Sequence, residues 1–183
     1  NPIFEGDAPI PAERIVTDDQ LRQYEEKYTL TARLAQQAGF DGIDIKCCHR
    51  YLACELLSAY TRPGEYGGSF ENRYRFAVDV VKALKAACGE NYPVSLRYSV
   101  LSKTKDFCVG AMPGEVYDEI GRDMEESEKA AKYLQDAGYD MLNADNGTYD
   151  AWYWAHPPAY MPKNCNLDDV AHIRKFVDIP VVC

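Results

Sequence analysis

The sequence predicts an α/β fold with parallel strands, organised as one domain over residues 1–183. Segments with helical periodicity alternate with short apolar strand patterns along the whole chain. The joints between them also repeat, because "QAGFDGIDI" at 37–45 resembles "DAGYDMLNA" at 136–144, and "NYPVSLR" resembles "DIPVVC". Such paired joints favour a barrel of repeated βα units, although a doubly wound sheet can also produce them.

The individual elements follow from periodicity and from their end signals. Helices are expected over residues 18–38, 69–88, 120–137 and 167–176, and strands over residues 41–46, 92–99, 140–145 and 179–183. Gly39 and Gly138 stand where the first and third helices would end. Ser69 is a favourable N-cap for the second helix.

The strands carry a second pattern, because successive residues of a strand point to opposite sides. In three of the expected strands one side is mostly apolar and the other carries charged, amide or hydroxyl groups. Helices would cover the apolar side. The polar side fits the interior of a barrel near its C-terminal mouth, where Lys46, Arg97 and Asn143 would converge.

Composition excludes several classes of protein. Of the 183 residues, 46% are hydrophobic and 27% are charged, which is typical of a soluble globular domain with a sizeable core. The net charge of −9 argues against nucleic-acid binding. No apolar run is long enough to cross a membrane, and no charged-then-apolar leader is visible. The seven cysteines are odd in number and irregularly spaced, so we expect free thiols in a reducing, cytoplasmic compartment.

The two ends are unusual for a complete domain. The chain opens in the loop-like "NPIFEGDAPIPAER" and stops within "DIPVVC", which has the character of a buried strand. We therefore expect the chain to be a fragment of a longer protein.

The stretch from residue 46 to residue 54 concentrates reactive side chains, including Cys47, Cys48, His49 and Cys54. No metal site is expected, because adjacent cysteines seldom bind one ion and no paired CxxC occurs in the chain. A nucleophilic thiol activated by a neighbouring lysine or histidine is a better alternative. The favoured interpretation is simpler: small residues that pack the end of a strand.

Lys46, His49 and Tyr51 offer a different chemistry. All three can donate hydrogen bonds to a carbonyl oxygen and stabilise the negative charge that develops on it, and Tyr51 can also deliver a proton. The alternative is that Tyr51 is merely half-buried and His49 is a solvated loop residue. Spacing alone favours this alternative.

Two segments resemble the Old Yellow Enzyme family of flavin-dependent ene-reductases: "AGFDGIDI" followed by H-x-Y-L, and the more specific "YGGSFENRYRF". The likeness covers nearly the whole chain, and "NADNGTYDAWYWAHPPAY" at 143–160 is similar to the branch of 2-enoate reductase and 2,4-dienoyl-CoA reductase. It implies a partial TIM barrel that holds the fourth to seventh strands of a flavin oxidoreductase domain. FMN would be the cofactor, NADH or NADPH the reductant, and a small-molecule alkene conjugated to a carbonyl the substrate.

The resemblance also implies roles for single residues. Tyr51 matches the family's proton donor, and His49 matches the second of its two carbonyl-binding donors. Lys46 stands where the first donor is usually histidine. Arg97 matches the arginine that contacts the pyrimidine edge of the flavin, where reduced flavin gathers negative charge. The substrate side would be lined by Tyr149, Trp152, Tyr153, Trp154 and His156, although an aromatic cluster that packs a long loop is an equally good interpretation.

The sequence also departs from the family pattern. Lys46 replaces histidine, Arg50 replaces the glycine usual before the tyrosine, and "TRPGEYGG" is shorter than its family counterpart. The loops that grip the flavin phosphate would lie outside this chain, so we expect the isolated fragment to be inactive, to bind flavin weakly and to self-associate through open sheet edges. Two alternatives stay open: a flavin-dependent dehydrogenase of amines or other substrates, and a non-catalytic binding domain that kept the fold.

Overall fold

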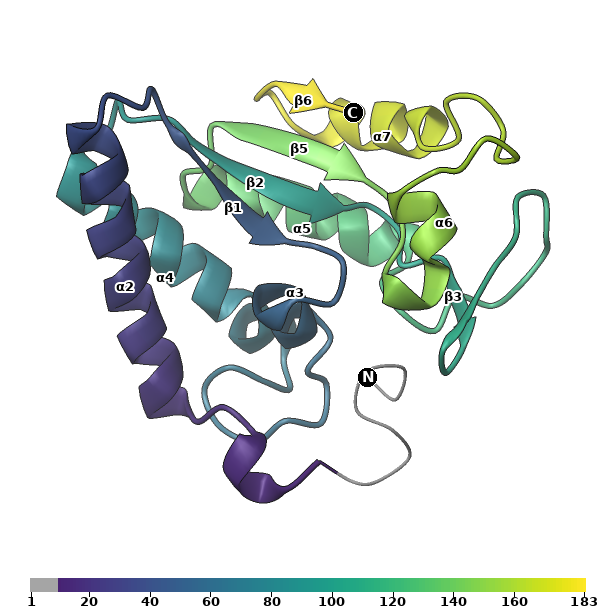
Figure 1. Ribbon diagram of the computed structural model, residues 1–183, viewed down its shortest axis with the longest axis horizontal. Helices are drawn as coiled ribbons and strands as arrows, with labels where there is room; N and C mark the ends of the chain where they lie inside the picture. The colour runs from purple at the N-terminus through teal and green to yellow at the C-terminus, as the bar shows by residue number, and fades with distance from the viewer. Residues whose placement is uncertain (1–9) are drawn as a thin grey trace.

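A computed structural model describes residues 10–183 as a parallel sheet with helices against one face (Figure 1). The four strands are β1 (Ile43–Cys47), β2 (Val94–Ser99), β5 (Met141–Asp145) and β6 (Val181–Val182). They are hydrogen-bonded in the order β1-β2-β5-β6, and every pair is parallel. The expectation of an α/β fold with about four parallel strands is confirmed, and within residues 10–183 the strands do not close into a barrel.

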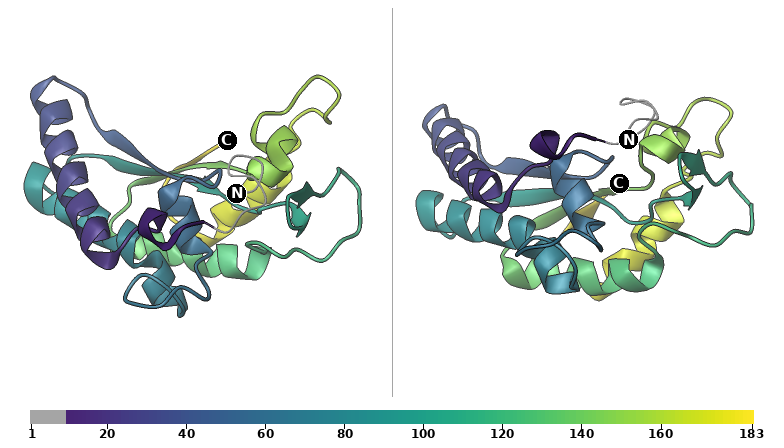
Figure 2. Two further views of the ribbon diagram at one scale, coloured as in Figure 1. Left: turned by 60° about the horizontal axis from the view of Figure 1, so that its bottom comes forward. Right: turned by 90° about the horizontal axis from the view of Figure 1, so that it is seen from below.

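Four helices, α2, α4, α5 and α7, form an arc around one face of this curved sheet (Figure 2). They are α2 (Asp18–Gln37), α4 (Phe70–Cys88), α5 (Met124–Ala137) and α7 (Leu167–Ile173), which continues into the 3-10 turn Arg174–Phe176. The core lies between these helices and the apolar side of the sheet. Its fully buried members include Val80, Val81, Leu84, Leu96, Leu134 and Leu142.

The predicted two-sided character of the strands is confirmed. Ile45, Leu96 and Leu142 are buried under the helices, whereas Lys46 is exposed and Arg97 is half-buried on the other side. One residue of slip would exchange these sides, so burial of the apolar set specifies the register of the sheet.

Side-chain caps set where the helices begin. The Thr17 side chain accepts a hydrogen bond from the amide of Gln20 at the start of α2, and Ser69 caps α4 as expected. The third helix was expected from Ile120, but that prediction was wrong by about a turn. The Asp123 side chain caps a helix that begins at Met124, so Ile120 lies in the preceding loop and is 57% exposed.

Several short elements were not predicted. They are the 3-10 turn Ala12–Arg14, the helix α3 (Leu52–Leu57), the hairpin of β3 (Thr104–Asp106) with β4 (Val109–Gly110), the 3-10 turn Tyr149–Ala151 and the helix α6 (Trp152–Ala155). The helix α3 and the segment from residue 149 to α6 follow strands β1 and β5 directly, so they build the surface around the C-terminal ends of those strands (Figure 1).

No disulfide joins any of the cysteines within residues 10–183. Across that same part of the chain, no helix has both the length and the apolar character that a membrane span requires.

Candidate functional site

The C-terminal half of the sheet carries a row of polar side chains. Lys46 of β1 lies opposite Arg97 of β2, and Arg97 lies opposite Asn143 of β5. The predicted convergence of these three residues is therefore confirmed as adjacent positions across three strands. The Asn143 amide also contacts the Asp44 carboxylate at 3.3 Å, so the polar side of the sheet is internally hydrogen-bonded.

The loop after β1 turns sharply because two consecutive residues adopt left-handed backbone angles. His49 has a φ of 57° and Arg50 a φ of 54°, in a region that costs a non-glycine residue about 1–2 kcal/mol. The turn directs the rings of His49 and Tyr51 into different surroundings. His49 is buried, at 1% exposure, whereas Tyr51 is 47% exposed and precedes α3 as its N-cap residue.

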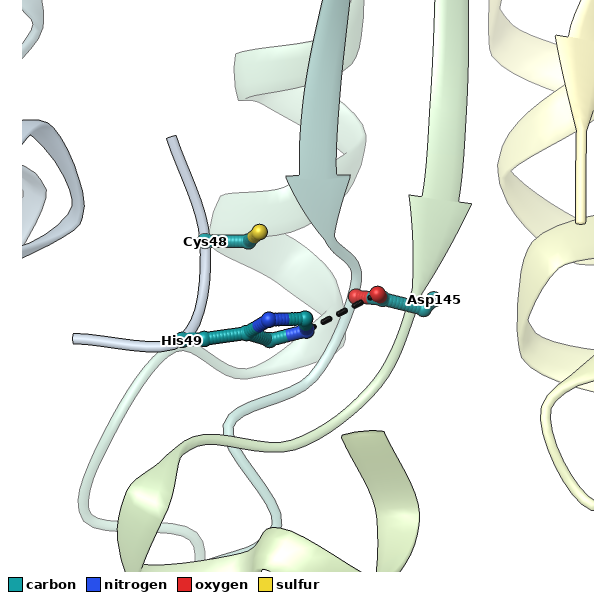
Figure 3. Close-up of side chains that lie close together, drawn as sticks. All are labelled: Cys48, His49 and Asp145. Atoms are coloured by element: carbon teal, nitrogen blue, oxygen red, sulfur yellow. Dashed lines mark hydrogen bonds and ion pairs between the residues drawn. The ribbon is translucent and has the colours of Figure 1, made fainter. Parts of the chain in front are cut away.

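Asp145, at the end of β5, connects the buried histidine to the sheet (Figure 3). His49 Nε2 lies 2.8 Å from Asp145 Oδ2, and Arg97 Nη2 lies 3.0 Å from the same oxygen. The other oxygen accepts a hydrogen bond from the Ser99 hydroxyl at 2.9 Å. The carboxylate therefore fixes both a predicted carbonyl-binding residue and the predicted flavin-contacting residue.

Asp145 was not predicted as a site residue. Its signal was present in the strand alternation, which placed it on the polar side of its strand with Asn143. What the alternation could not reveal is the contact with His49, because those two residues are 96 positions apart in the chain.

This network stabilises the charged form of Arg97. Partial burial works against the guanidinium charge, but the hydrogen bond and ion pair with Asp145 raise the pKa of Arg97 above its ordinary value. Both contacts to Asp145 use Nε and Nη2, and Nη1 makes no hydrogen bond to any residue within 10–183. Arg97 thus has donors left for an anionic group on the open side of the sheet.

Cys48, His49 and Asp145 form the one group of three potential metal ligands found in the described part of the chain, with donor atoms within 4.8 Å of one another (Figure 3). Two observations argue that this group is a hydrogen-bonded network and not a metal centre. The Arg97 guanidinium already occupies the carboxylate, bringing a positive charge where a cation would bind. Burial, and then the charge of Asp145, raise the pKa of the Cys48 thiol well above its usual range, which disfavours the thiolate that a metal requires.

The same reasoning applies to a nucleophilic cysteine. Cys47, Cys48 and Cys54 are all buried, and burial is the largest cause of the raised pKa of each thiol. A thiol that stays protonated is a poor nucleophile. The interpretation of these cysteines as packing residues at the strand end is therefore the one that the structure supports.

Tyr51 lies between a cation and a second tyrosine. The Lys46 ammonium lies 3.7 Å from the centroid of the Tyr51 ring, on its face. The Tyr149 hydroxyl donates a hydrogen bond to the Tyr51 hydroxyl at 2.7 Å. Lys46, Tyr51 and Tyr149 thus lie together, whereas the His49 ring is directed toward Asp145.

The aromatic residues of the expected substrate side form a stack that leads from Tyr51 to His49. Tyr149 and Trp152 lie parallel, with ring centroids 4.8 Å apart. The ring centroids of Trp152 and His156 are 4.1 Å apart. His156 lies 5.8 Å from the buried His49 ring. Trp152 is 42% exposed, so the stack presents a flat aromatic wall to solvent beside the predicted proton donor.

The remaining two aromatic residues of that segment, Tyr153 and Trp154, do not belong to the stack. The Trp154 indole nitrogen and the Tyr153 hydroxyl both donate to the carbonyl oxygen of Ala111, in the segment after β4. Trp154 is buried in a small second cluster with Ala151 and Met161. These two residues therefore pack the long loop, as the alternative interpretation held.

Comparison with known proteins decides the family. A family model described as the NADH:flavin oxidoreductase / NADH oxidase family matches residues 3–149. The chain belongs to this family. The expected resemblance to the family of flavin oxidoreductases is therefore confirmed.

Curated relatives within the NADH:flavin oxidoreductase family include a cinnamate reductase of Clostridium sporogenes. The chain is 45% identical to it over 172 residues, which is 92% of this chain and 26% of that protein. An NADH oxidase of Thermoanaerobacter brockii is 31% identical over 171 residues, or 92% of this chain and 24% of that protein. The chain thus spans about a quarter of the length of these two relatives.

Two solved structures have a similar fold. Histamine dehydrogenase from Rhizobium sp. 4-9 matches with a TM-score of 0.74 and 26% identity, over 97% of this chain and 24% of that one. The old yellow enzyme homologue from Zymomonas mobilis matches with a TM-score of 0.66 and 26% identity, over 97% and 45%. The fold of this member of the NADH:flavin oxidoreductase family is therefore that of a segment of these TIM-barrel proteins.

Proposed function

We propose that the chain supplies the fourth to seventh strands of an FMN-dependent ene-reductase, which reduces an alkene conjugated to a carbonyl. NADH or NADPH would be the reductant. The observation that carries this proposal is the position of the exposed Tyr51 phenol, directly under the Lys46 ammonium and beside the row that contains Arg97. An acid, a cation and a flavin-binding arginine at one mouth are what such a reduction requires.

The residues present fit a flavin. Arg97 is a fixed cation on the open side of the sheet, and it keeps unused donors that would hold the pyrimidine edge of the cofactor. When bound, the flavin would supply the hydride for the β-carbon of the alkene. The chain's own contribution is to bind the substrate, polarise its carbonyl and deliver a proton to the α-carbon.

The roles of the site residues follow from their surroundings. Tyr51 would protonate the α-carbon, because it is the exposed acid of the site. Lys46 would bind the substrate's oxygen atoms, and His49 would assist by exchanging its bond to Asp145 for one to the substrate. Tyr149, Trp152 and His156 would provide the flat wall against which a planar substrate lies.

Lys46 also favours an acidic substrate. It makes no ion pair with any acidic residue among those described, so its charge at the mouth is available to an anion. A free carboxylate conjugated to the alkene would be attracted by this charge, and an aryl group would stack on the Tyr149–Trp152 pair. The 45% identity to a protein named cinnamate reductase supports the same substrate class, an aryl-substituted 2-enoate.

A second candidate is a flavin-dependent amine dehydrogenase, favoured by the TM-score of 0.74 to histamine dehydrogenase. The same lysine argues against it, because a protonated amine would be repelled by an unpaired ammonium group at 3.7 Å from the Tyr51 ring. The ene-reductase is therefore the function that we propose.

The test uses the complete flavin enzyme that contains this chain. Its reduced flavin is mixed in a stopped-flow instrument with an aryl 2-enoate or with the methyl ester of that acid, and its oxidised flavin is mixed with an amine. We expect reoxidation by the acid, slower reoxidation by the ester and no reduction by the amine. Reduction of the flavin by the amine would establish the dehydrogenase, and no reaction with any of the three would favour a non-catalytic domain.

Lys46→Met is the matched variant for the substrate class. Methionine keeps the length of the side chain but removes the charge, so both reactions should slow, the acid reaction more than the ester reaction, and the preference for the acid should disappear. Equal loss of both reactions would show that Lys46 acts on the carbonyl and does not select the carboxylate.

We further propose a cytoplasmic location, which is supported by the absence of disulfides among the cysteines of residues 10–183.

A further inference from the structure

Two tyrosines from distant parts of the chain share a hydrogen bond at the proposed proton-donating residue. Tyr149 Oη donates to Tyr51 Oη at 2.7 Å, and the two rings lie 5.7 Å apart between centroids. The direction of this bond matters. Since Tyr149 uses its own hydrogen in the contact, the hydrogen of Tyr51 stays available for a substrate.

A donor in this position acts on the charge that forms during proton delivery. As Tyr51 gives up its proton, negative charge develops on its oxygen, and the Tyr149 hydroxyl is already directed at that atom. The Lys46 ammonium over the Tyr51 ring contributes positive charge to the same place. Both contacts would stabilise the negative charge that develops on the Tyr51 oxygen as the proton is delivered.

The residues next to the two tyrosines are themselves joined. Arg50 precedes Tyr51 and Asp150 follows Tyr149, and Arg50 Nη1 contacts Asp150 Oδ2 at 2.5 Å. The Asp150 side chain is only 3% exposed, so this ion pair is shielded from solvent on its acidic side. Arg50 Nε also contacts Glu55 in α3 at 2.7 Å, which ties the pair to a helix.

Arg50 occupies this position at a conformational cost. Its φ of 54° lies in the left-handed region that favours glycine. A strained residue persists where its surroundings hold it in place, and here the buried carboxylate of Asp150 does so. The strain therefore points to a role for the arginine side chain in this loop.

We propose that Tyr149 is a proton-relay partner of Tyr51, and that the Arg50–Asp150 ion pair holds their two hydroxyls in contact. This inference deepens the proposed ene-reductase function and rests on it. The Tyr51 O–H bond breaks as the C–H bond at the substrate α-carbon forms, while the β-carbon receives the hydride. The Tyr149 proton moves to the Tyr51 oxygen, and Tyr149 then takes a proton from water.

The first test needs no activity. Tyrosines of the 183-residue chain are labelled with ¹³C at the ζ carbon, and the Tyr149 signal is followed by NMR as the pH is raised. The hydrogen bond to Tyr51 is the largest cause of the raised pKa of Tyr149, followed by desolvation and then by the nearby Tyr51 and Cys48. Tyr51→Phe removes the acceptor, so we expect the pKa of Tyr149 to fall toward the ordinary tyrosine value of 10.0.

Arg50→Gly tests the ion pair in the same experiment. Glycine relieves the backbone strain but frees the loop from Asp150, so the tyrosines should separate and the pKa of Tyr149 should again fall. Tyr160→Phe, at a residue that is 74% exposed, is the control and should leave the titration unchanged. Asp150→Asn provides a second route if Arg50→Gly folds poorly, because it weakens the pair from the other side.

The titration can overturn each half of the proposal. An unchanged pKa of Tyr149 in Tyr51→Phe would show that the two hydroxyls are not coupled. An unchanged pKa in both Arg50→Gly and Asp150→Asn would show that the ion pair does not hold them together.

The second test measures the relay in the complete flavin enzyme. Tyr149→Phe keeps the ring on Trp152 and removes only the hydroxyl. We expect reoxidation by the alkene to slow by about 10- to 100-fold, which is the rate equivalent of a hydrogen bond to a charged group. Flavin reduction by the nicotinamide is measured in the same variant, because that half-reaction delivers no proton to the alkene.

The solvent isotope dependence separates a relay from a packing role. The rate of flavin reoxidation is measured in mixtures of H₂O and D₂O. In the parent enzyme this rate should depend on the D₂O fraction along a curve, because two protons move. In Tyr149→Phe the dependence should be linear, because one proton moves. A variant that only raises the substrate KM and leaves the curve unchanged would make Tyr149 a wall residue and overturn the relay. If the parent flavin is not reoxidised by any alkene, the proposed function itself fails, whereas the titration result stands independently.

Discussion

At the scale of residues, a single carboxylate positions the polar side chains at the C-terminal end of the sheet. Asp145 binds the buried His49 ring and the guanidinium of Arg97, and Ser99 donates to its other oxygen. His49 is buried at 1% exposure, so this contact satisfies a ring nitrogen that water does not reach. The orientation of a predicted carbonyl-binding residue and that of a predicted flavin-binding residue therefore depend on one side chain.

Tyr51→Phe is the residue change that isolates proton delivery in the complete enzyme. Phenylalanine keeps the ring under the Lys46 ammonium and removes only the acidic hydrogen. Flavin reduction by the nicotinamide needs no proton at the alkene, so it should run at nearly the parent rate. Reoxidation by the alkene should slow by roughly 10²- to 10⁴-fold, as is typical for loss of a general acid.

Stopped-flow measurement of the two half-reactions decides this prediction. Reoxidation at the parent rate in Tyr51→Phe would place the proton donor elsewhere, and His49 would be the next candidate.

The sequence predicted which residues lie at the mouth better than it predicted their contacts. Strand alternation placed Lys46, Arg97 and Asn143 on one side, because the side-chain period of two depends only on local geometry. The partners of His49 and Arg50 were not foreseen. Both bind aspartates about a hundred positions away, and such pairings depend on how the loops after β1 and β5 are placed in space.

At the scale of elements, a buried ion pair joins three helices. Arg73 of α4 donates to both oxygens of Glu126 in α5, at 2.8 and 2.9 Å, and also to the carbonyl oxygen of Leu57 at the end of α3. Arg73 is 4% exposed, and the Tyr74 hydroxyl adds a further hydrogen bond to Glu126 at 3.1 Å. The helix that follows Tyr51 is thus held against the helical layer.

Glu126→Gln should destabilise the chain by about 3 kcal/mol near neutral pH, because it leaves the Arg73 charge buried without its ionic partner. Urea unfolding measures the loss. Glu125→Gln, one position earlier on the exposed side of α5, is the control and should change the free energy of unfolding little.

The same pair predicts a pH dependence. Burial raises the pKa of Glu126, but the hydrogen bonds and the charge of Arg73 lower it by more. The pKa of Glu126 in the folded chain is therefore below the usual value of 4.5. A carboxyl group with a lowered pKa in the folded state contributes stability above pH 4.5, and this contribution is lost as the pH falls through the folded-state pKa. The difference between parent and Glu126→Gln should therefore shrink in acid, and a constant difference down to pH 3 would contradict the assignment.

The long helices were predictable, and the shortest helices were not. The helices α2 and α4 carry several turns of apolar periodicity and a capping residue each, so pattern and end signals agree. The helix α3 has six residues and α6 has four, which is too few for a period to be read and too few for a helix to be stable by itself. Their existence depends on packing, through contacts such as the one between Arg73 and Leu57.

At the scale of the whole molecule, the sheet ends in two unpaired edges. Strand β1 pairs only with β2, and β6 pairs only with β5, among residues 10–183. An unpaired parallel edge offers free backbone donors and acceptors to another strand. We expect the isolated 183-residue chain to form dimers or larger species, which light scattering across a range of concentrations measures. A monomer at all concentrations would contradict this expectation.

Flavin retention is the second expectation for the whole chain. Arg97 is the single residue here to which we assign a flavin contact, and one cation gives little affinity by itself. The isolated chain, incubated with excess FMN and desalted, should therefore show no flavin absorbance in the visible spectrum. A stoichiometric flavin band after desalting would mean that the described residues bind the cofactor without further help.

The strand order has a consequence for how such a chain is made. In the sheet, β1, β2, β5 and β6 lie in the same order as they are synthesised, so each strand after β1 is made when the preceding strand of the sheet is already present. At a synthesis rate of about 5–20 residues per second, every new strand has seconds to add to a single growing edge before its successor arrives. The polar row with Lys46, Arg97 and Asn143 is therefore completed one member at a time from the N-terminal side.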